Sequence, residues 1–289
     1  MTDALIQPVQ RSEALVDDMR SADVSQGFCV WWLGQSGFLI KAPGGVLLFD
    51  PYLSESLTKK YARTDKPHTR LSELVIEPGL LDMVDVVTSS HNHTDHLDAF
   101  TLNPLREACE GLTIVVPEAN RAFAADRLGM QSDELTVLDA GKSIEVGAFT
   151  LHAVPAAHNE LDTDDQGRHK YLGFVAQFDA GGRRCGVYHS GDTLRYEGMA
   201  EAVGQWPIDL ALLPINGNKP ERRVAGNLFG DEAAQLAKDI NAGLVLPCHY
   251  DLFAFNTETP DLFVQSCESL AQPHRVPKLG ERVDIMIES

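Results

Sequence analysis

Short apolar runs separated by turns dominate the chain from residue 28 onward. The first three, at 29–33, 38–41 and 46–49, are divided by glycine-containing turns such as Pro43-Gly44-Gly45, a spacing typical of an antiparallel meander. Further runs predict strands at 84–89, 112–116, 143–154, 172–178, 184–187, 210–213, 244–246 and 283–287. Because several of these runs are apolar throughout, we expect sheets whose faces are covered by helices.

Helical periodicity appears in two internal segments. One covers 118–128 and ends at Gly129, and the other covers 231–240 and ends near Gly243. Residues 1–26 predict a helical N-terminal extension with Ala14, Leu15 and Met19 on its apolar side, which either caps the fold or meets a partner subunit of a homo-oligomer. We expect 27–289 to form one domain, because a chain of 289 residues with 44% hydrophobic content can bury a large core.

Composition narrows the range of partners and compartments. A formal net charge of −18 argues against nucleic-acid binding, which depends on Lys and Arg side chains that neutralise phosphates. Neither a signal peptide nor a long apolar segment occurs, so we expect no membrane association. The five cysteines are scattered, without paired spacing, and predict reduced thiols rather than disulfides. Together these features favour a cytoplasmic protein that acts on a small molecule.

The densest chemistry lies in 90–98, Ser-His-Asn-His-Thr-Asp-His-Leu-Asp. His91 and His93 are two residues apart, so in an extended segment both imidazoles point to one side and can bind one ion. Asp95 and His96 follow a turn and face a second position, as a two-metal hydrolytic centre requires. The alternative is a solvated histidine-rich loop. The apolar run at 84–89 favours the metal site, because it delivers the cluster to a strand end.

Three later residues offer the remaining ligands. His158, Asp192 and His249 each follow a short apolar run. A single histidine at a strand end is more often a satisfied polar residue than a ligand. Their combination with the first cluster favours a shared metal centre.

The order His-x-His-x-Asp-His, His, Gly-Asp, His resembles that of the metallo-β-lactamase superfamily. The stretches 34–38, 49–54, 213–217 and 247–251 are similar to the branch typified by L-ascorbate-6-phosphate lactonase, and the likeness extends from about residue 27 to the C-terminus. The resemblance implies an α/β fold, a four-layer αββα sandwich with a dinuclear site between the loop ends of the two sheets.

The resemblance also implies a ligand set. It assigns His91, His93 and His158 to one ion, Asp95, His96 and His249 to the other, and Asp192 to a bridge between them. The lactonase branch implies manganese, zinc is usual in the superfamily, and iron also suits nitrogen and oxygen ligands. Cys248 is an alternative ligand, although its side chain points away from that of His249 in an extended segment.

The expected reaction is hydrolysis by a metal-bridged hydroxide that attacks an ester-type carbonyl. The resemblance favours a lactonase for an anionic, phosphorylated sugar lactone. Alternatives are a phosphodiesterase or phospholipase-D-like hydrolase, and a diiron oxygen or nitric oxide reductase, which has glutamate where this chain has His93 and needs a flavin domain. A non-catalytic metal-binding protein is the alternative outside enzymes.

Supporting roles are open for four further residues. Asp50 ends an apolar run and is expected either to accept a hydrogen bond from a ligand histidine or to stabilise a turn. His189 lies two residues before the Gly-Asp turn and is expected near the ligands. Asn216 and Tyr250, with Asp95 and Asp192, are the candidate catalytic groups; the first two either donate to a developing oxyanion or hold their own loops.

A basic segment stands out in this acidic chain. Residues 57–71 contain five Lys and Arg residues against one acid, and a second basic group lies at 219–223. The ordinary interpretation is a solvated loop. The functional hypothesis is an anion clamp above the metals, in which Lys59, Arg63, Arg222 and Arg223 contact the substrate.

Overall fold

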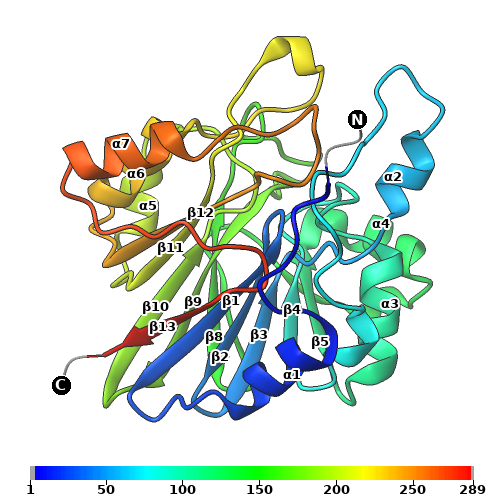
Figure 1. The fold of residues 1–289 in the computed structure, drawn as a ribbon. Helices are drawn as coiled ribbons and strands as arrows, with labels where there is room; N and C mark the ends of the chain where they lie inside the picture. Colours follow the sequence, from blue (N-terminus) through cyan, green and yellow to red (C-terminus); the bar gives the residue numbers. More distant parts are fainter. Residues whose placement is uncertain (1–3, 288–289) are drawn as a thin grey trace.

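The computed structural model describes residues 4–287. Two β-sheets pack face to face, and helices cover the outer side of each sheet (Figure 1). The layers therefore run helix, sheet, sheet, helix. The four-layer αββα sandwich expected from the sequence is confirmed.

The first sheet has seven strands in the order β13-β1-β2-β3-β4-β5-β6. Strands β1 to β3 and β13 pair in antiparallel fashion, whereas β3, β4, β5 and β6 run parallel. The strands of this sheet are β1 (Gly27–Gly34), β2 (Gly37–Ala42), β3 (Gly45–Phe49), β4 (Val86–Thr88), β5 (Thr113–Pro117), β6 (Thr136–Leu138) and β13 (Arg282–Met286).

The second sheet has six strands in the order β12-β11-β10-β9-β8-β7. Strands β7 to β10 are antiparallel, and β10, β11 and β12 are parallel. Their bounds are β7 (Ser143–Val146), β8 (Phe149–Pro155), β9 (Leu172–Ala180), β10 (Arg183–His189), β11 (Leu210–Pro214) and β12 (Leu244–Cys248).

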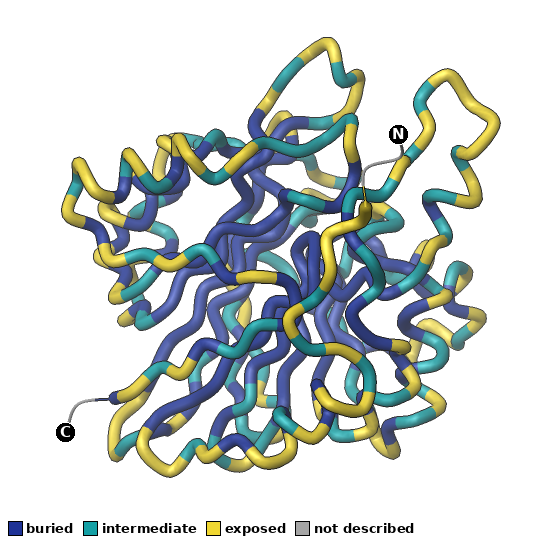
Figure 2. Tube along the Cα trace, in the orientation of Figure 1, coloured by how far each residue is buried: buried dark blue, intermediate teal, exposed yellow. Residues whose placement is uncertain are grey.

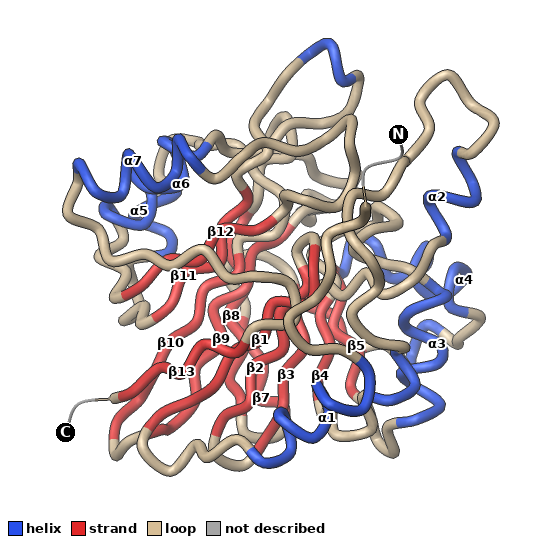
Figure 3. Tube along the Cα trace, in the orientation of Figure 1, coloured by secondary structure: helices blue, strands red, loops and turns tan. Residues whose placement is uncertain are grey.

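The helices form two groups on opposite sides of the sandwich (Figure 1). Helices α5 (Met199–Val203), α6 (Gly230–Asp239) and α7 (Asp261–Ser269) lie beside the six-stranded sheet, and α1 (Ser12–Ser21), α3 (Ala99–Ala108) and α4 (Arg121–Leu128) lie beside the seven-stranded sheet. Helix α2 (Ser56–Tyr61) projects at the end of the sandwich where most long loops gather (Figure 3). Four short 3-10 turns complete the described elements, at Pro78–Leu80, Glu118–Asn120, Ser132–Glu134 and Pro220–Arg222.

The core explains why several strands are apolar on both faces. In β1, Phe28 points toward the second sheet and packs edge-on against Phe178, with ring centroids 5.1 Å apart. Trp31 has the opposite parity, and its indole Nε1 donates to Asp18 of α1 at 2.8 Å. Every residue of β1 is buried. Burial is concentrated between the layers and falls off toward the loops (Figure 2).

Most predicted elements occur, with one clear error. The strand expected at 143–154 is a hairpin of β7 and β8, because Gly147 adopts φ of 56° and turns the chain. The helix expected at 118–128 begins as a 3-10 turn and continues as α4, which ends where Gly129 enters the left-handed region. Helices α2, α3, α5 and α7 and strand β6 were not predicted from the sequence.

Helix α1 forms within the N-terminal extension, but its buried side differs from the prediction. Leu15, Val16 and Met19 are buried, whereas Ala14 is exposed. Lys41 of β2 donates to the carbonyls of Met19, Arg20 and Ala22 at 2.8 to 3.0 Å. These bonds satisfy carbonyls at the helix C-terminus and attach α1 to the sheet.

Candidate metal centre

The carboxyl ends of several strands meet at one end of the sandwich and carry the polar residues of the site. The segment after β4 supplies His91 to His96, and residues just beyond β8, β10 and β12 supply His158, Asp192 and His249. Strand β8 runs parallel to β10 because each is antiparallel to β9. Loops at this edge are therefore brought together by sheet topology, as in other open α/β sheets.

Three groups of three side chains converge in this region, and one of them, formed by Asp50, His91 and His96, shares a histidine with each of the other two. The nearest ligand atoms of His91, His93 and His158 lie within 4.8 Å of one another, and the same holds for Asp95, His96 and His249. These are the two sets that the sequence resemblance assigned to separate ions.

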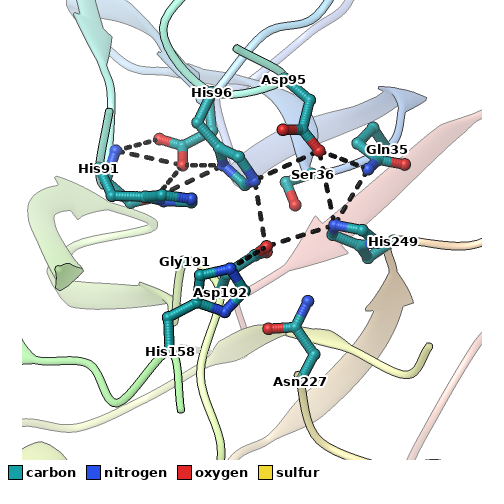
Figure 4. A network of polar contacts seen from close by, with 12 residues as sticks. Gln35, Ser36, His91, Asp95, His96, His158, Gly191, Asp192, Asn227 and His249 are labelled. Carbon is teal, nitrogen blue, oxygen red and sulfur yellow. Dashed lines mark hydrogen bonds and ion pairs between the residues drawn. The ribbon is translucent and has the colours of Figure 1, made fainter. Parts of the chain in front are cut away.

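Asp192 lies between the two groups (Figure 4). Its Oδ1 is 3.3 Å from Nε2 of His96, and its Oδ2 is 3.3 Å from Nε2 of His249 and 3.6 Å from Nε2 of His158. A carboxylate has lone pairs on both oxygens and can therefore bind two ions, whereas one imidazole nitrogen binds one. The position of Asp192 suits a bridge.

Four buried atoms of the proposed ligands have no hydrogen-bond partner among the described residues. They are Nε2 of His91, Nε2 of His96, Nδ1 of His249 and Oδ1 of Asp192. The 3.3 Å approach between His96 and Asp192 thus does not meet hydrogen-bond geometry. Buried polar atoms without partners are costly. Apart from the Gln35 amide beside Asp95 and His249, the nitrogen and carboxylate atoms that converge here meet no donor from another described residue, so the residues present fit the metal that the sequence implies.

Contacts behind the histidines fix their tautomers. Nδ1–H of His96 donates to Oδ2 of Asp50 at 2.7 Å, and Nδ1–H of His158 donates to the carbonyl of Gly226 at 2.9 Å. Each Nε2 therefore presents its lone pair to the site. Hydrogen bonds of this kind orient metal-binding imidazoles and raise their basicity.

Asp50 is the centre of this supporting network, as one of its two sequence interpretations expected. It is fully buried and also accepts from the Thr88 hydroxyl at 3.0 Å and from the Ser90 amide at 3.0 Å. Burial raises the pKa of Asp50, but the hydrogen bond and charge of His96 outweigh it, so the pKa lies below its ordinary value. The group is therefore a carboxylate that can hold the His96 ring.

His189 supports the site through the backbone. Its Nε2–H donates to the Ser36 carbonyl at 2.9 Å, and its Nδ1 accepts from the Gly191 amide at 3.3 Å. The ring stacks on Phe49 with centroids 4.9 Å apart. His189 consequently holds the turn that presents Asp192 rather than touching one of the ligand side chains.

The protonation states of His96 and of the other groups differ. Burial lowers the pKa of His96, but Asp192 and Asp95 outweigh burial and raise it well above its ordinary value, so an ion would displace the proton of this ring. Burial lowers the pKa of His158 to about 4, so its imidazole is neutral at neutral pH. Burial raises the pKa of Asp192, yet the neighbouring His249 and His96 lower it well below its ordinary value. A neutral imidazole and a charged carboxylate are the forms that bind metal ions.

A cavity of ≈440 Å³ opens onto these residues. Its floor includes His93, Asp95, His158, Asp192 and His249, and its walls include Leu57, Lys60, Tyr61, His68, Phe123, Arg127, Val224, Phe253, Phe255 and Asn256. The volume lies in the range of small-molecule sites, about 300 to 1,000 Å³.

Two expected catalytic residues do not reach this cavity. The Tyr250 hydroxyl donates to the Pro277 carbonyl at 2.7 Å, and its ring stacks on Trp32 in a different cavity. The Asn216 amide donates to Oδ1 of Asn256 at 3.0 Å and accepts from Asn227 at 3.0 Å. Both residues hold loops, so the expectation that they donate to an oxyanion is corrected.

The expected anion clamp is also corrected. Arg222 is largely buried and donates to the Thr257 carbonyl at 2.7 Å and to Glu258 and the Asn216 carbonyl. Arg223 pairs with Asp65 at 2.9 Å on the surface, and Lys59 pairs with Glu55 at 3.3 Å. Neither these three residues nor Arg63 belongs to the cavity lining. Arg222, Arg223 and Lys59 therefore pair with nearby groups of the protein, although the sequence pattern assigned them to a substrate.

Three residues at the site were missed by the sequence analysis. Gln35 donates to Asp95 at 2.8 Å and lies 3.0 Å from Nε2 of His249. Arg127 Nη1 donates to the carbonyls of Asn92 and Leu97 at 2.6 and 3.1 Å, which holds both ends of the ligand loop. His68 lines the cavity. The motif around 34–38 gave a signal for Gln35, whereas an arginine in a helix and a histidine in a basic loop gave none.

Residues 46–250 match the family model described as Beta-lactamase superfamily domain. The chain belongs to the metallo-β-lactamase superfamily. A UPF0173 metal-dependent hydrolase of Rubrobacter xylanophilus is 30% identical over 84% of this chain and 90% of its own length, which places the chain among the metal-dependent hydrolases of the superfamily.

More distant relatives share the fold. A protein of Escherichia coli described as "Probable L-ascorbate-6-phosphate lactonase UlaG" is 21% identical over 83% of this chain and 74% of its own length. The structure of an isothiocyanate hydrolase from Delia radicum gut bacteria has a TM-score of 0.69 at 17% identity and covers 90% of this chain and 100% of that one. At 17% identity, this structural similarity shows that the two proteins share a fold.

Cys248 belongs to none of the candidate ligand groups of the described residues, and burial raises the pKa of its thiol well above the ordinary value. It is therefore not supported as a ligand. Among the helices of residues 4–287, none has the length and apolarity needed to cross a bilayer.

Proposed function

We propose that this superfamily member hydrolyses lactones or related carboxylic esters with two divalent metal ions bound at the centre around Asp192. The observation that carries the proposal is the position of this carboxylate, within 3.3 Å of a nitrogen in one group of candidate ligands and 3.6 Å of a nitrogen in the other. His91, His93 and His158 would hold one ion, and Asp95, His96 and His249 the other. Manganese and zinc both suit these ligands.

Bound ions of this kind supply a water of lowered pKa and polarise an ester carbonyl. The protein supplies the orientation. Asp50 and the Gly226 carbonyl hold the His96 and His158 rings, and Arg127 holds the ends of the ligand loop.

The phosphorylated sugar lactone expected from the sequence is not part of this proposal. Arg222 and Arg223, on which the expectation of an anionic substrate depended, are bound to loop acceptors and to Asp65. The bond that is hydrolysed is an ester or lactone bond, and no phosphate group on the substrate is proposed. It also includes a cytoplasmic location and a homo-oligomeric state; the five free and buried cysteines support a reducing compartment.

The test uses the full-length protein, stripped with a chelator and then reloaded with Mn²⁺ or Zn²⁺. Metal analysis should find two ions per chain, and γ-lactones or 4-nitrophenyl esters should be hydrolysed only after reloading. Full metal occupancy together with no turnover across a lactone and ester panel would contradict the proposal and favour a non-catalytic metal-binding protein.

A further inference from the structure

The cavity above the metal centre has one wall made of aromatic rings. His68 stacks on Tyr61 with centroids 4.2 Å apart and meets Phe253 and Phe255 edge-on at 5.1 and 4.6 Å. All four residues line the cavity. Such a surface offers large apolar area and few hydrogen-bonding groups.

This wall is a built part of the fold. Phe253 and Leu57 belong to a small hydrophobic cluster that is separate from the main core and includes Tyr61 and Phe255 at its edge. Backbone bonds join its two segments, from Leu71 N to the Leu252 carbonyl at 2.8 Å and from Ala254 N to the Thr69 carbonyl at 3.0 Å. Loops that pack a cluster of their own present a defined surface to a ligand.

Two further apolar side chains of the cavity lining are exposed. Phe123 of α4 is 43% exposed and Val224 is 37% exposed, and both line the same cavity. Large apolar side chains that remain exposed beside a polar centre mark a site at which a ligand covers them. Covering these two residues would bury apolar surface on the ligand as well.

The cavity's two basic residues do not form a phosphate clamp. Arg127 uses Nη1 for the Asn92 and Leu97 carbonyls, and its guanidinium lies 4.4 Å from the centre of the Phe123 ring. Lys60 is exposed at the rim, with Nζ 5.2 Å from the Tyr61 ring centre. His68 donates Nδ1–H to the Lys66 carbonyl at 3.2 Å, so its neutral ring leaves only an acceptor nitrogen, which repels an anionic oxygen.

From these contacts we infer that the substrate is an uncharged lactone or ester with an apolar alkyl substituent, which contacts the aromatic wall, Phe123 and Val224 while the ester group faces the metal centre. The inference rests on the proposed hydrolytic function and specifies its substrate class. The reaction is the addition of water across the acyl C–O bond, which yields a carboxylic acid and an alcohol.

The experiment compares the metal-loaded protein on γ-octalactone, unsubstituted γ-butyrolactone and a γ-lactone bearing a phosphate group. We expect kcat/KM for γ-octalactone to exceed the other two at least about 10-fold, because each buried methylene contributes about 0.8 kcal/mol. Phe123→Ala and Val224→Ser should each remove most of this preference, measured as the ratio of kcat/KM for γ-octalactone to kcat/KM for γ-butyrolactone in the same variant. Phe123→Leu, which keeps an apolar side chain, should retain it.

Phe100→Ala is the matched control, because Phe100 is 72% exposed on the neighbouring helix α3 and does not line the cavity. Binding provides a readout without turnover: calorimetry should show tighter binding of 2-butylcyclopentanone than of cyclopentanone, with Phe123→Ala weakened about 10-fold and Phe100→Ala unchanged.

The outcomes separate the two proposals. Turnover of all three lactones at similar rates, a preference for the phosphorylated lactone, or equal losses in Phe123→Ala and Phe100→Ala would overturn the inference while leaving lactone hydrolysis in place. Absence of turnover on every lactone, with alkyl-dependent ketone binding intact, would overturn the hydrolytic function and keep the apolar site. Turnover of bis(4-nitrophenyl) phosphate alone would overturn both.

Discussion

Two buried aspartates near the centre have different surroundings and therefore different expected roles. Asp192 contacts side chains from both ligand groups, whereas Asp50 contacts one of them, His96, from behind. We therefore expect Asp192 to affect how many ions bind, and Asp50 to affect the orientation of the His96 ring.

Asp192→Asn should reduce activity far more than Asp50→Asn. The amide removes the charge that serves both groups, whereas loss of an outer hydrogen-bond partner typically costs about 10- to 100-fold in metal affinity or activity. Steady-state rates with metal analysis of each variant measure the difference. If Asp192→Asn keeps two ions and the parent rate, this residue is not a ligand.

Arg127 is a residue whose importance is visible only in three dimensions. Its guanidinium group is half-buried and donates to carbonyls on both sides of the ligand loop. We expect Arg127→Met to lower metal affinity and to destabilise the protein by about 1 to 2 kcal/mol, near the lower end for hydrogen bonds from a charged group. Metal titration and thermal unfolding would measure both effects.

Arg121→Met is the matched control for this prediction. Arg121 lies on the same helix and has no side-chain hydrogen bond to another described residue. Equal effects of the two substitutions would show that Arg127 acts through helix stability and not through the ligand loop.

At the scale of elements, the turn after β10 is a tightly packed connection in the site. Gly191 has φ of 61°, and a Cβ there would lie 2.7 Å from the Leu172 carbonyl oxygen and 2.7 Å from the Ser90 side chain. The turn carries Asp192 toward the ligand loop that follows β4. Tight packing between these two segments fixes the position of the carboxylate relative to the histidines.

Gly191→Ala should therefore destabilise the fold by more than about 2 kcal/mol and reduce metal affinity, because it adds steric overlap to an unfavourable backbone conformation. Gly182→Ala provides the comparison. Gly182 has φ of 82°, but a Cβ added there would have no other atom within 4 Å, so this substitution should lower the free energy of unfolding by only about 1 kcal/mol. Chemical denaturation would measure both. Similar losses in the two variants would contradict the packing argument.

At the scale of the whole molecule, the centre joins both sheets. The seven-stranded sheet supplies the loop with His91 to His96, and the six-stranded sheet supplies the segments with His158, Asp192 and His249. Metal binding consequently links two layers of the sandwich as well as side chains within one loop.

Chelation should lower the thermal midpoint markedly and added Mn²⁺ or Zn²⁺ should restore it. An ion at 1,000 times its dissociation constant stabilises the native state by about 4 kcal/mol, and a protein of this size shifts by about 2 to 4 °C per kcal/mol, so a shift of roughly 8 °C or more is expected. Calorimetry with and without chelator measures it. An unchanged midpoint would show that the ions are not bound by the folded state.

The pattern of the sequence predicted sheets covered by helices and polar residues that follow strand ends, and its resemblance to the superfamily implied the four layers and the two ligand groups. The first two are local properties: a run of apolar residues makes a buried strand, and the residues just after it lie at the sheet edge where other strand ends also lie. His158, Asp192 and His249 were therefore found although they lie far from one another along the chain.

Tertiary structure decided the hairpin at Gly147 and the walls of the cavity. The strand-like pattern of 143–154 continues through Gly147 and does not show where the chain turns, whereas the positive φ of Gly147 does. Arg222 and Arg223 were expected at the substrate and Arg127 was not considered, yet Arg222 and Arg223 are bound to loop groups and Arg127 lies at the cavity. A long cationic side chain can extend several ångströms in many directions. Its contacts depend on which acceptors the folded chain brings close to it, and a local sequence pattern does not contain that information.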